Sequence, residues 1–145
     1  MALDVRLIAG PLSAPAELEA FLAGRTGDGA VVSFIGLARG VARDGSVVDA
    51  LRLDWYPGLT EGSMHDIAAA AAARFPVRDL VVAHRCGDIV PGETIVFVAA
   101  AAAHRRAAFE AADYRRILEA RDRPRRRPLD RARGRGSRRR GALEG

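Results

Sequence analysis

The sequence predicts an α+β domain, with helices packed on a mostly antiparallel sheet, followed by a disordered arginine-rich tail. Two observations indicate this organisation. Short β-branched runs alternate loosely with alanine-rich helical segments, and Pro-Gly turns separate several of them. The charge also changes abruptly: residues 1–114 contain 10 arginines and 14 acidic residues, whereas residues 115–145 contain 13 arginines and 4 acidic residues. We therefore divide the chain into a domain, 1–114, and a tail, 115–145.

The first half of the domain is expected to contain three strands and one helix. Ser13 can cap the helix through its hydroxyl group, and an apolar series continues from there to Leu22. The segment GAVVSF is β-branched, and residues 47–56 alternate apolar and charged side chains, as in a strand with one face in water. The expected elements are strands at 4–8, 29–34 and 47–56 and a helix ending near residue 22.

The second half is expected to contain two helices and two strands. Met64, Ile67 and a run of alanines share one side of the first helix, which Pro76 ends. Pro91-Gly92 forms a turn before the strand TIVFV, and the alanine run 99–103 reads as buried core. The expected elements are helices at 60–74 and 104–114 and strands at 80–83 and 94–98.

The tail combines high positive charge with few large apolar residues, and Pro124 and Pro128 interrupt any helix. Such a segment buries too little apolar surface to offset the entropy of ordering it, so residues 115–145 are predicted to be disordered. Thirteen arginines would also give salt-sensitive, non-specific affinity for nucleic acid. No aromatic residue follows Tyr114, so stacking on single strands is not supported.

Composition favours a cytoplasmic protein. No stretch approaches the roughly 20 consecutive apolar residues of a membrane span, and the first ten residues lack the regions of a signal peptide. The single cysteine, Cys86, excludes an internal disulfide and fits a reducing compartment. All 23 basic residues are arginine, and the chain contains no lysine.

Gly36-Leu37-Ala38-Arg39 is the first candidate site, because it directly follows a predicted strand. Glycine permits a close approach of ligand to backbone, and the planar guanidinium of Arg39 suits phosphate or carboxylate. On residue type alone, a solvated loop arginine is the simpler interpretation, and anion binding is its alternative.

His84-Arg85-Cys86-Gly87 and the following Pro91-Gly92-Glu93 are interpreted as structural. A histidine at the end of a strand is more often structural than a ligand. Cys86 has no neighbouring histidine except His84, two positions earlier, which gives little support for a nucleophile. Three scattered histidines and one cysteine show no metal-ligand spacing, so no metal site is predicted.

His104-Arg105-Arg106 lies where a buried strand meets the start of a predicted helix. The N-terminus of a helix has unpaired N–H groups and a dipole that favours anions. Basic residues at that end are electrostatically unfavourable unless an anion compensates them. The segment is therefore a candidate site for a phosphorylated or acidic small molecule, with simple solvent exposure as the alternative.

Four segments together resemble successive motifs of the large, catalytic subunit of molybdopterin synthase, in both order and spacing. They are GAVVSFIGLAR at 29–39, VDALRLDWYPG at 48–58, HRCGDIVPGE at 84–93 and AAHRRAAFEAADY at 102–114. The resemblance covers about four-fifths of the chain, residues 1–114. It implies an α/β hammerhead fold and a homodimer within a heterotetramer. The other partner is a small ubiquitin-like sulfur-carrier subunit whose C-terminal Gly-Gly carries a thiocarboxylate.

The resemblance further implies sulfur transfer from that thiocarboxylate to cyclic pyranopterin monophosphate, a step in molybdenum cofactor biosynthesis, with no cofactor bound by the enzyme itself. Its substrate-contacting positions fall on Leu37, Ala38 and Arg39 and on His104 and Arg105. We hypothesise that both clusters line one cationic recess.

The tail departs from the family pattern. The family continues into a segment close to LKTRAPFWKRE, whose two lysines lie in the active site, whereas Ala120 and Arg127 stand near those positions here. Arginine cannot replace lysine as a proton shuttle, because it stays charged. No catalytic residue is therefore assigned, and His104 and Arg105 are the nearest candidates. A change of reading frame near Tyr114 is one hypothesis, which resequencing of the gene tests. A non-catalytic scaffold that binds the small subunit is the alternative function.

Overall fold

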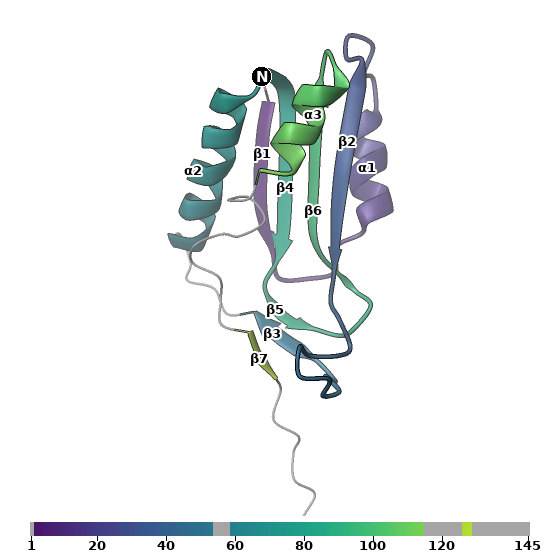
Figure 1. The fold of residues 1–145 in the computed structure, drawn as a ribbon, viewed down its shortest axis with the longest axis vertical. Helices are drawn as coiled ribbons and strands as arrows, with labels where there is room; N and C mark the ends of the chain where they lie inside the picture. Colours follow the sequence, from purple (N-terminus) through teal and green to yellow (C-terminus); the bar gives the residue numbers. More distant parts are fainter. Residues whose placement is uncertain (1, 54–58, 115–125, 129–145) are drawn as a thin grey trace, which may run out of the picture.

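The computed structural model describes residues 2–53, 59–114 and 126–128. It confirms the α+β class, with three helices and a mostly antiparallel arrangement of strands in the described residues (Figure 1). The helices are α1 (Ala14–Leu22), α2 (Leu59–Arg74) and α3 (Arg105–Ala112). The strands are β1 (Ala2–Ile8), β2 (Ala30–Leu37), β3 (Leu51–Leu53), β4 (Val77–Arg85), β5 (Gly87–Ile89), β6 (Thr94–Ala102) and β7 (Arg126–Pro128).

The larger sheet has four strands in the order β1-β4-β6-β2. β4 and β6 lie at its centre and pair antiparallel, and β2 pairs antiparallel with β6. β1 pairs with β4 in parallel, with Ala2 opposite Asp79 and Ile8 opposite Arg85. β1 and β2 are therefore the two edges of this sheet.

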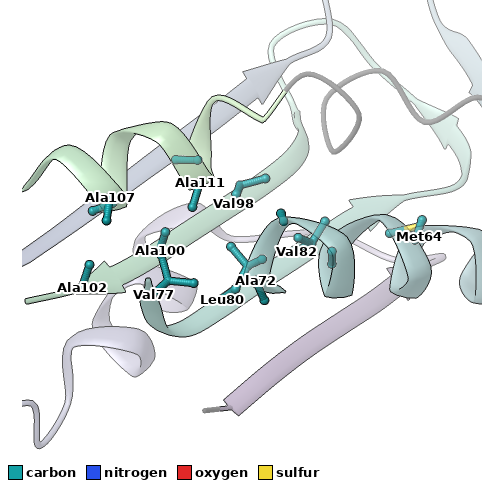
Figure 2. Packing of buried hydrophobic residues seen from close by; sticks show 14 residues of the cluster. Met64, Ala72, Val77, Leu80, Val82, Val98, Ala100, Ala102, Ala107 and Ala111 are labelled. Carbon is teal, nitrogen blue, oxygen red and sulfur yellow. The ribbon is translucent and has the colours of Figure 1, made fainter. Parts of the chain in front are cut away.

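Helices cover both faces of the larger sheet: α2 and α3 pack on one face and α1 on the other (Figure 1). Side chains of β6 alternate between these faces, because successive residues of a strand point in opposite directions. Val98, Ala100 and Ala102 join the α2–α3 cluster, which Figure 2 shows, whereas Phe97, Ala99 and Ala101 join the α1 cluster. A central strand covered on both faces reads as a continuous apolar run, which accounts for the buried alanines.

The elements of the larger sheet match the prediction in type and order, and all four strands extend beyond their predicted bounds. β4 begins at Val77 rather than residue 80, and β6 continues through the alanine run to Ala102. The predicted helix at 104–114 is α3, and His104 is its N-cap residue. Ser13 caps α1 as expected, since its Oγ accepts a hydrogen bond from the Ala16 N–H at 3.3 Å.

The smaller sheet has three antiparallel strands in the order β5-β3-β7. The predicted strand 47–56 is only partly correct. Regular pairing is limited to Leu51–Leu53, and Val47 forms an isolated bridge with Val41 around a turn in which the Ser46 N–H and hydroxyl bond to Asp44. Residues 54–58 lie outside the described part. Strand β5 was not predicted.

β7, Arg126–Pro128, lies within the predicted tail. Residues 126–128 pair with β3, placing Arg127 opposite Arg52. Backbone groups form a ladder whatever the side chains, so low apolar content did not exclude this strand. The rest of 115–145 lies outside the described residues.

Candidate substrate-binding site

The first basic cluster, Leu37 to Arg39, follows a register shift at the end of β2. Ala38 is buried at 4% exposure among the apolar residues beneath the smaller sheet, whereas Leu37 and Arg39 are exposed. The Ala38 N–H donates to the Glu93 carbonyl at 2.9 Å, and the Ala38 carbonyl accepts from the Gly92 N–H at 2.8 Å. Ala38, which is buried and forms two backbone hydrogen bonds, thus fixes the backbone next to the exposed Arg39. No described residue pairs with the Arg39 guanidinium.

The second basic cluster, His104 and Arg105, begins helix α3. His104 has extended backbone angles, φ −132° and ψ 148°, and its side chain forms no capping hydrogen bond. The first turn of α3 contains no acidic residue, and both His104 and Arg105 are exposed. Arg106 instead pairs with Glu110 at 3.0 Å on the same helix. The helix start therefore presents positive charge and uncapped N–H groups, which suit an anion.

The strand register places these two clusters at opposite ends of the larger sheet. Leu37 pairs with Thr94 at one end of the β2–β6 ladder, and Ala30 pairs with Ala102 at the other end, next to His104. Seven residues of strand separate the two ends, or roughly 23 Å at about 3.3 Å per residue. The hypothesis that one chain forms a recess containing both clusters is wrong, because β6 must cross the whole sheet between them.

The segment 84–87 is structural in its contacts. Cys86 is buried, and its N–H donates to the Ile8 carbonyl at 2.9 Å. Burial raises the pKa of the Cys86 thiol, which disfavours the thiolate that a nucleophile requires. His84 Nδ1 lies 2.7 Å from the Arg85 carbonyl oxygen.

The ion pair between Arg85, whose side chain is 5% exposed, and Glu93, whose side chain is 37% exposed, was not predicted from the sequence. The two residues stand eight positions apart across the Pro91-Gly92 turn. Only the sequence HRCGDIVPGE, in which an arginine ends a strand and a glutamate follows a Pro-Gly turn, could have signalled it.

A hollow of about 760 Å³ lies at the His104 end of the sheet, between the segment 23–28 and the start of β4. Its charged side chains pair with one another: Arg25 Nη1 contacts Asp28 at 2.9 Å and Asp79 at 2.5 Å, and Arg78 Nε lies 3.4 Å from Asp28. Burial opposes ionisation of Asp79, but the bonds from Arg25 and the Ala2 N–H outweigh it and lower the Asp79 pKa. Two arginines and two aspartates leave no net charge, so this hollow does not suit an anionic substrate.

The described ranges offer neither a metal site nor a membrane-spanning helix. Residues 2–53, 59–114 and 126–128 contain no group of three histidine, cysteine or carboxylate side chains that could hold a metal ion. The helices of that part of the chain are too short or too polar to cross a bilayer.

The helix-flanked mixed sheet, with a small three-stranded sheet beyond it, defines an α+β protein of the α/β hammerhead type. The family model described as MoaE protein matches residues 8–119. The molybdopterin synthase catalytic subunit of Caulobacter vibrioides is 50% identical over 113 residues, covering 76% of this chain and 71% of that protein. The chain therefore belongs to the MoaE family, the molybdopterin synthase catalytic subunits of molybdenum cofactor biosynthesis, which confirms the resemblance seen in the sequence.

Solved structures agree with this assignment. The molybdopterin biosynthesis MoaE protein from Burkholderia ambifaria superposes with a TM-score of 0.69 at 34% identity, covering 82% of this chain and 75% of that one. A complex of subunits 1 and 2 of molybdopterin-converting factor from Helicobacter pylori has a TM-score of 0.66 at 21% identity, covering 88% and 91%. At that identity the second comparison supports the fold alone.

Proposed function

We propose that this chain binds cyclic pyranopterin monophosphate in the cytoplasm and takes part in sulfur transfer to it from a thiocarboxylated small subunit. The supporting observation is that the family positions fall on two exposed cationic clusters, 37–39 and 104–105, neither neutralised by a described acidic side chain. A phosphorylated pterin supplies the anion that each cluster lacks.

A second copy of the chain can bring the two clusters together. β2 is an edge strand, and it exposes Phe34, Ile35 and Leu37 at 39%, 44% and 57%. An exposed apolar edge favours pairing with another strand. If two β2 edges meet around a two-fold axis they run antiparallel. Arg39 of one copy then approaches the end at which the partner's His104 and Arg105 lie. The homodimer would thus form two composite recesses.

The small subunit supplies the sulfur in this proposal. The Caulobacter vibrioides relative is named a catalytic subunit, which implies that it works with a further subunit, and we assign the sulfur carrier to that place. A C-terminal thiocarboxylate is itself anionic, so the same cationic recess would favour its approach to the substrate. The assembly would be a heterotetramer of two large and two small subunits.

Turnover requires proton transfer, and this chain contains no lysine to carry it out. Arginine can stabilise developing negative charge but does not give up its proton, whereas an imidazole can exchange a proton near neutral pH. Among the residues of the proposed recess, His104 is therefore the side chain suited to proton transfer, and Arg105 to charge stabilisation. If neither suffices, the chain is a scaffold that binds both ligands without reaction.

The experiment combines the purified chain, thiocarboxylated small subunit and cyclic pyranopterin monophosphate, and measures binding by calorimetry and dithiolene product by mass spectrometry. Product formation supports the enzyme, and a ternary complex without product supports the scaffold. Absence of pterin binding would overturn the proposal.

A mixing experiment tests the composite recess. Arg39→Ala and a double variant, His104→Ala with Arg105→Ala, should each lose high-affinity pterin binding and retain only weak binding. If each recess takes one cluster from each copy, then mixing and reassembling the two proteins should restore about a quarter of the sites, because half of the dimers are mixed and each has one intact recess. No restoration would contradict the two-copy arrangement.

A further inference from the structure

We propose that the ion pair between the buried Arg85 and the partly exposed Glu93 positions the Arg39 loop for anion binding, which makes these two residues positioning residues of the site. The inference rests on the proposed function, since it assigns a role in the same recess. The side chains of Arg85 and Glu93 contact neither of the two basic clusters.

Arg85 occupies an unusual place for a cation. It ends the central strand β4, and its side chain is only 5% exposed. Its Nη1 donates to Glu93 Oε2, and its Nη2 donates to the Asp88 carbonyl at 3.3 Å. Its Nε has no hydrogen-bond partner among the described residues. Glu93 is 37% exposed, and an ion pair that water reaches contributes little to stability, so stability alone is a weak reason for this pair.

Glu93 links that cation to the substrate loop. Its Oε1 accepts from the Val90 N–H at 3.3 Å, which closes the turn around Pro91-Gly92. Its backbone carbonyl accepts from the Ala38 N–H, and Gly92 donates to the Ala38 carbonyl. Both backbone bonds of Ala38 therefore reach the turn that the Glu93 side chain and Arg85 hold together.

The turn also limits movement on the far side of Arg39. A Cβ added to Gly40 would lie 3.4 Å from the Pro91 Cβ, so this backbone is close to the turn. The Gly40 carbonyl accepts a hydrogen bond from the Val48 N–H at 2.9 Å. Arg39 is thus held between two residues that contact or closely approach the same turn. Its guanidinium stays exposed while its backbone is fixed.

The test uses two substitutions of Glu93 and one matched control. Glu93→Ala removes the carboxylate and leaves Arg85 unpaired, and Glu93→Gln retains an acceptor for the Val90 N–H. Asp88→Asn is the control, because it breaks a neighbouring Arg52 pair, 2.8 Å long, that does not touch the Arg39 loop. Each variant is studied in the full-length protein.

Two measurements separate positioning from general stability. Amide hydrogen exchange of Ala38 and Gly92 reports the anchor without any ligand. Calorimetric Kd for cyclic pyranopterin monophosphate reports the site, at a temperature where circular dichroism shows the variant fully folded. In Glu93→Ala we expect both amides to exchange about tenfold faster and Kd to rise about tenfold, a typical coupling between neighbouring residues. Glu93→Gln keeps the Val90 bond but lacks the charge that pairs with Arg85, so it should recover only a small part of both losses, and full recovery would assign the positioning to the Val90 bond instead.

A double-mutant cycle with Arg39→Ala completes the test. If the ion pair acts through Arg39, Glu93→Ala should add no further loss of affinity once Arg39 is removed, and Asp88→Asn should leave Kd unchanged in both backgrounds. Equal amide exchange and equal Kd in the parent and Glu93→Ala would overturn the inference. The inference would also be overturned if the effects of Arg39→Ala and Glu93→Ala on the binding free energy were additive. If Glu93→Ala does not fold, Glu93→Gln and the Arg85→Lys variant are measured in the same way.

The two proposals fail differently. If the parent protein and Asp88→Asn both fail to bind the pterin, the proposed function is overturned and the positioning role falls with it, even if exchange at Ala38 still depends on Glu93. If the parent binds and Glu93→Ala binds equally well, only the positioning role is wrong.

Discussion

The two ends of the β2–β6 ladder each carry one of the basic clusters, but different interactions hold them. At the Arg39 end, two backbone hydrogen bonds join Ala38 to a turn that the Arg85–Glu93 ion pair, with side chains 5% and 37% exposed, holds together. At the His104 end, α3 begins without a side-chain cap. The ion pair nearby, Arg25–Asp79, is exposed to a similar degree, at 17% and 27%, but it forms no bond to the start of α3.

This difference indicates how each half of the proposed recess responds to its surroundings. The bonds that hold Ala38 are backbone hydrogen bonds and not ion pairs, so salt should disturb the Arg39 loop little. The start of α3 has uncapped N–H groups, so it should respond more strongly to a bound anion. The Arg39 half of the proposed recess would thus be preorganised, and the His104 half would adapt to the bound anion.

The largest effect should come from the core that both ends share. Leu80 is fully buried between β4 and helices α2 and α3, so Leu80→Ala should lower the free energy of unfolding by about 2–5 kcal/mol. Urea denaturation followed by circular dichroism should show one transition. Two separate transitions would mean that the ends fold independently. Leu22→Ala, at a side chain 47% exposed, is the control and should cost much less.

The next effect tests close packing at the His104 end. A Cβ at Gly29 would lie 2.1 Å from the Ala103 carbonyl oxygen, so Gly29→Ala should destabilise the protein by about 1–3 kcal/mol. Gly62 lies within α2 and has no atom within 4 Å of such a Cβ. Gly62→Ala should instead stabilise the protein by about 0.5–1 kcal/mol. Equal melting temperatures for the two variants would contradict this contact.

A smaller effect should separate stability from binding at the same end. His104→Asp supplies α3 with a capping acceptor and a negative charge near its N-terminus, which should add about 1 kcal/mol to the free energy of unfolding. The same change places an anion where the substrate phosphate is proposed to lie. The melting temperature should therefore rise while pterin affinity falls. Arg39→Ala should lower affinity without that gain in stability.

The smallest effect should appear in acid. The Asp79 pKa lies below its usual 3.8 in the folded protein, so the folded state binds fewer protons than the unfolded state around that pH. The stability that this carboxylate contributes is fully present above pH 4 and is lost as the pH falls through its folded pKa. The urea concentrations at the midpoint of unfolding of the parent and of Asp79→Asn should therefore converge below the folded pKa of Asp79. A difference that grows in acid would contradict the assigned pairing.

Sequence patterns predicted the larger sheet better than the smaller one, because its signals are local. The β-branched runs marked β2 and the start of β6. The extension of β6 through Ala99–Ala102 was not expected as a strand, since alanine has a low strand propensity. Packing between helices on both faces overrides that propensity. Strands β5 and β7 have only three residues each and depend on pairing with β3.

The candidate residues were chosen by type, and their spatial relation required the strand register. Nothing in the spacing of Arg39 and His104 along the chain shows that a whole strand length separates them. The Arg85–Glu93 pair escaped notice for a similar reason, because a charged residue at a strand end is usually solvated. Burial of that arginine depends on how β4 meets the turn at 91–92 in three dimensions.

The strand order has a consequence for protein synthesis. Both N-terminal strands, β1 and β2, lie at the edges of the sheet, and their pairing partners β4 and β6 are made later. At about 5–20 residues per second, the 65 residues from Leu37 to Ala102 take roughly 3–13 s to leave the ribosome. During that interval the nascent chain has no strand to accept β2. Chaperones should therefore bind ribosome-attached chains that end before residue 94, because they would protect the unpaired strand β2.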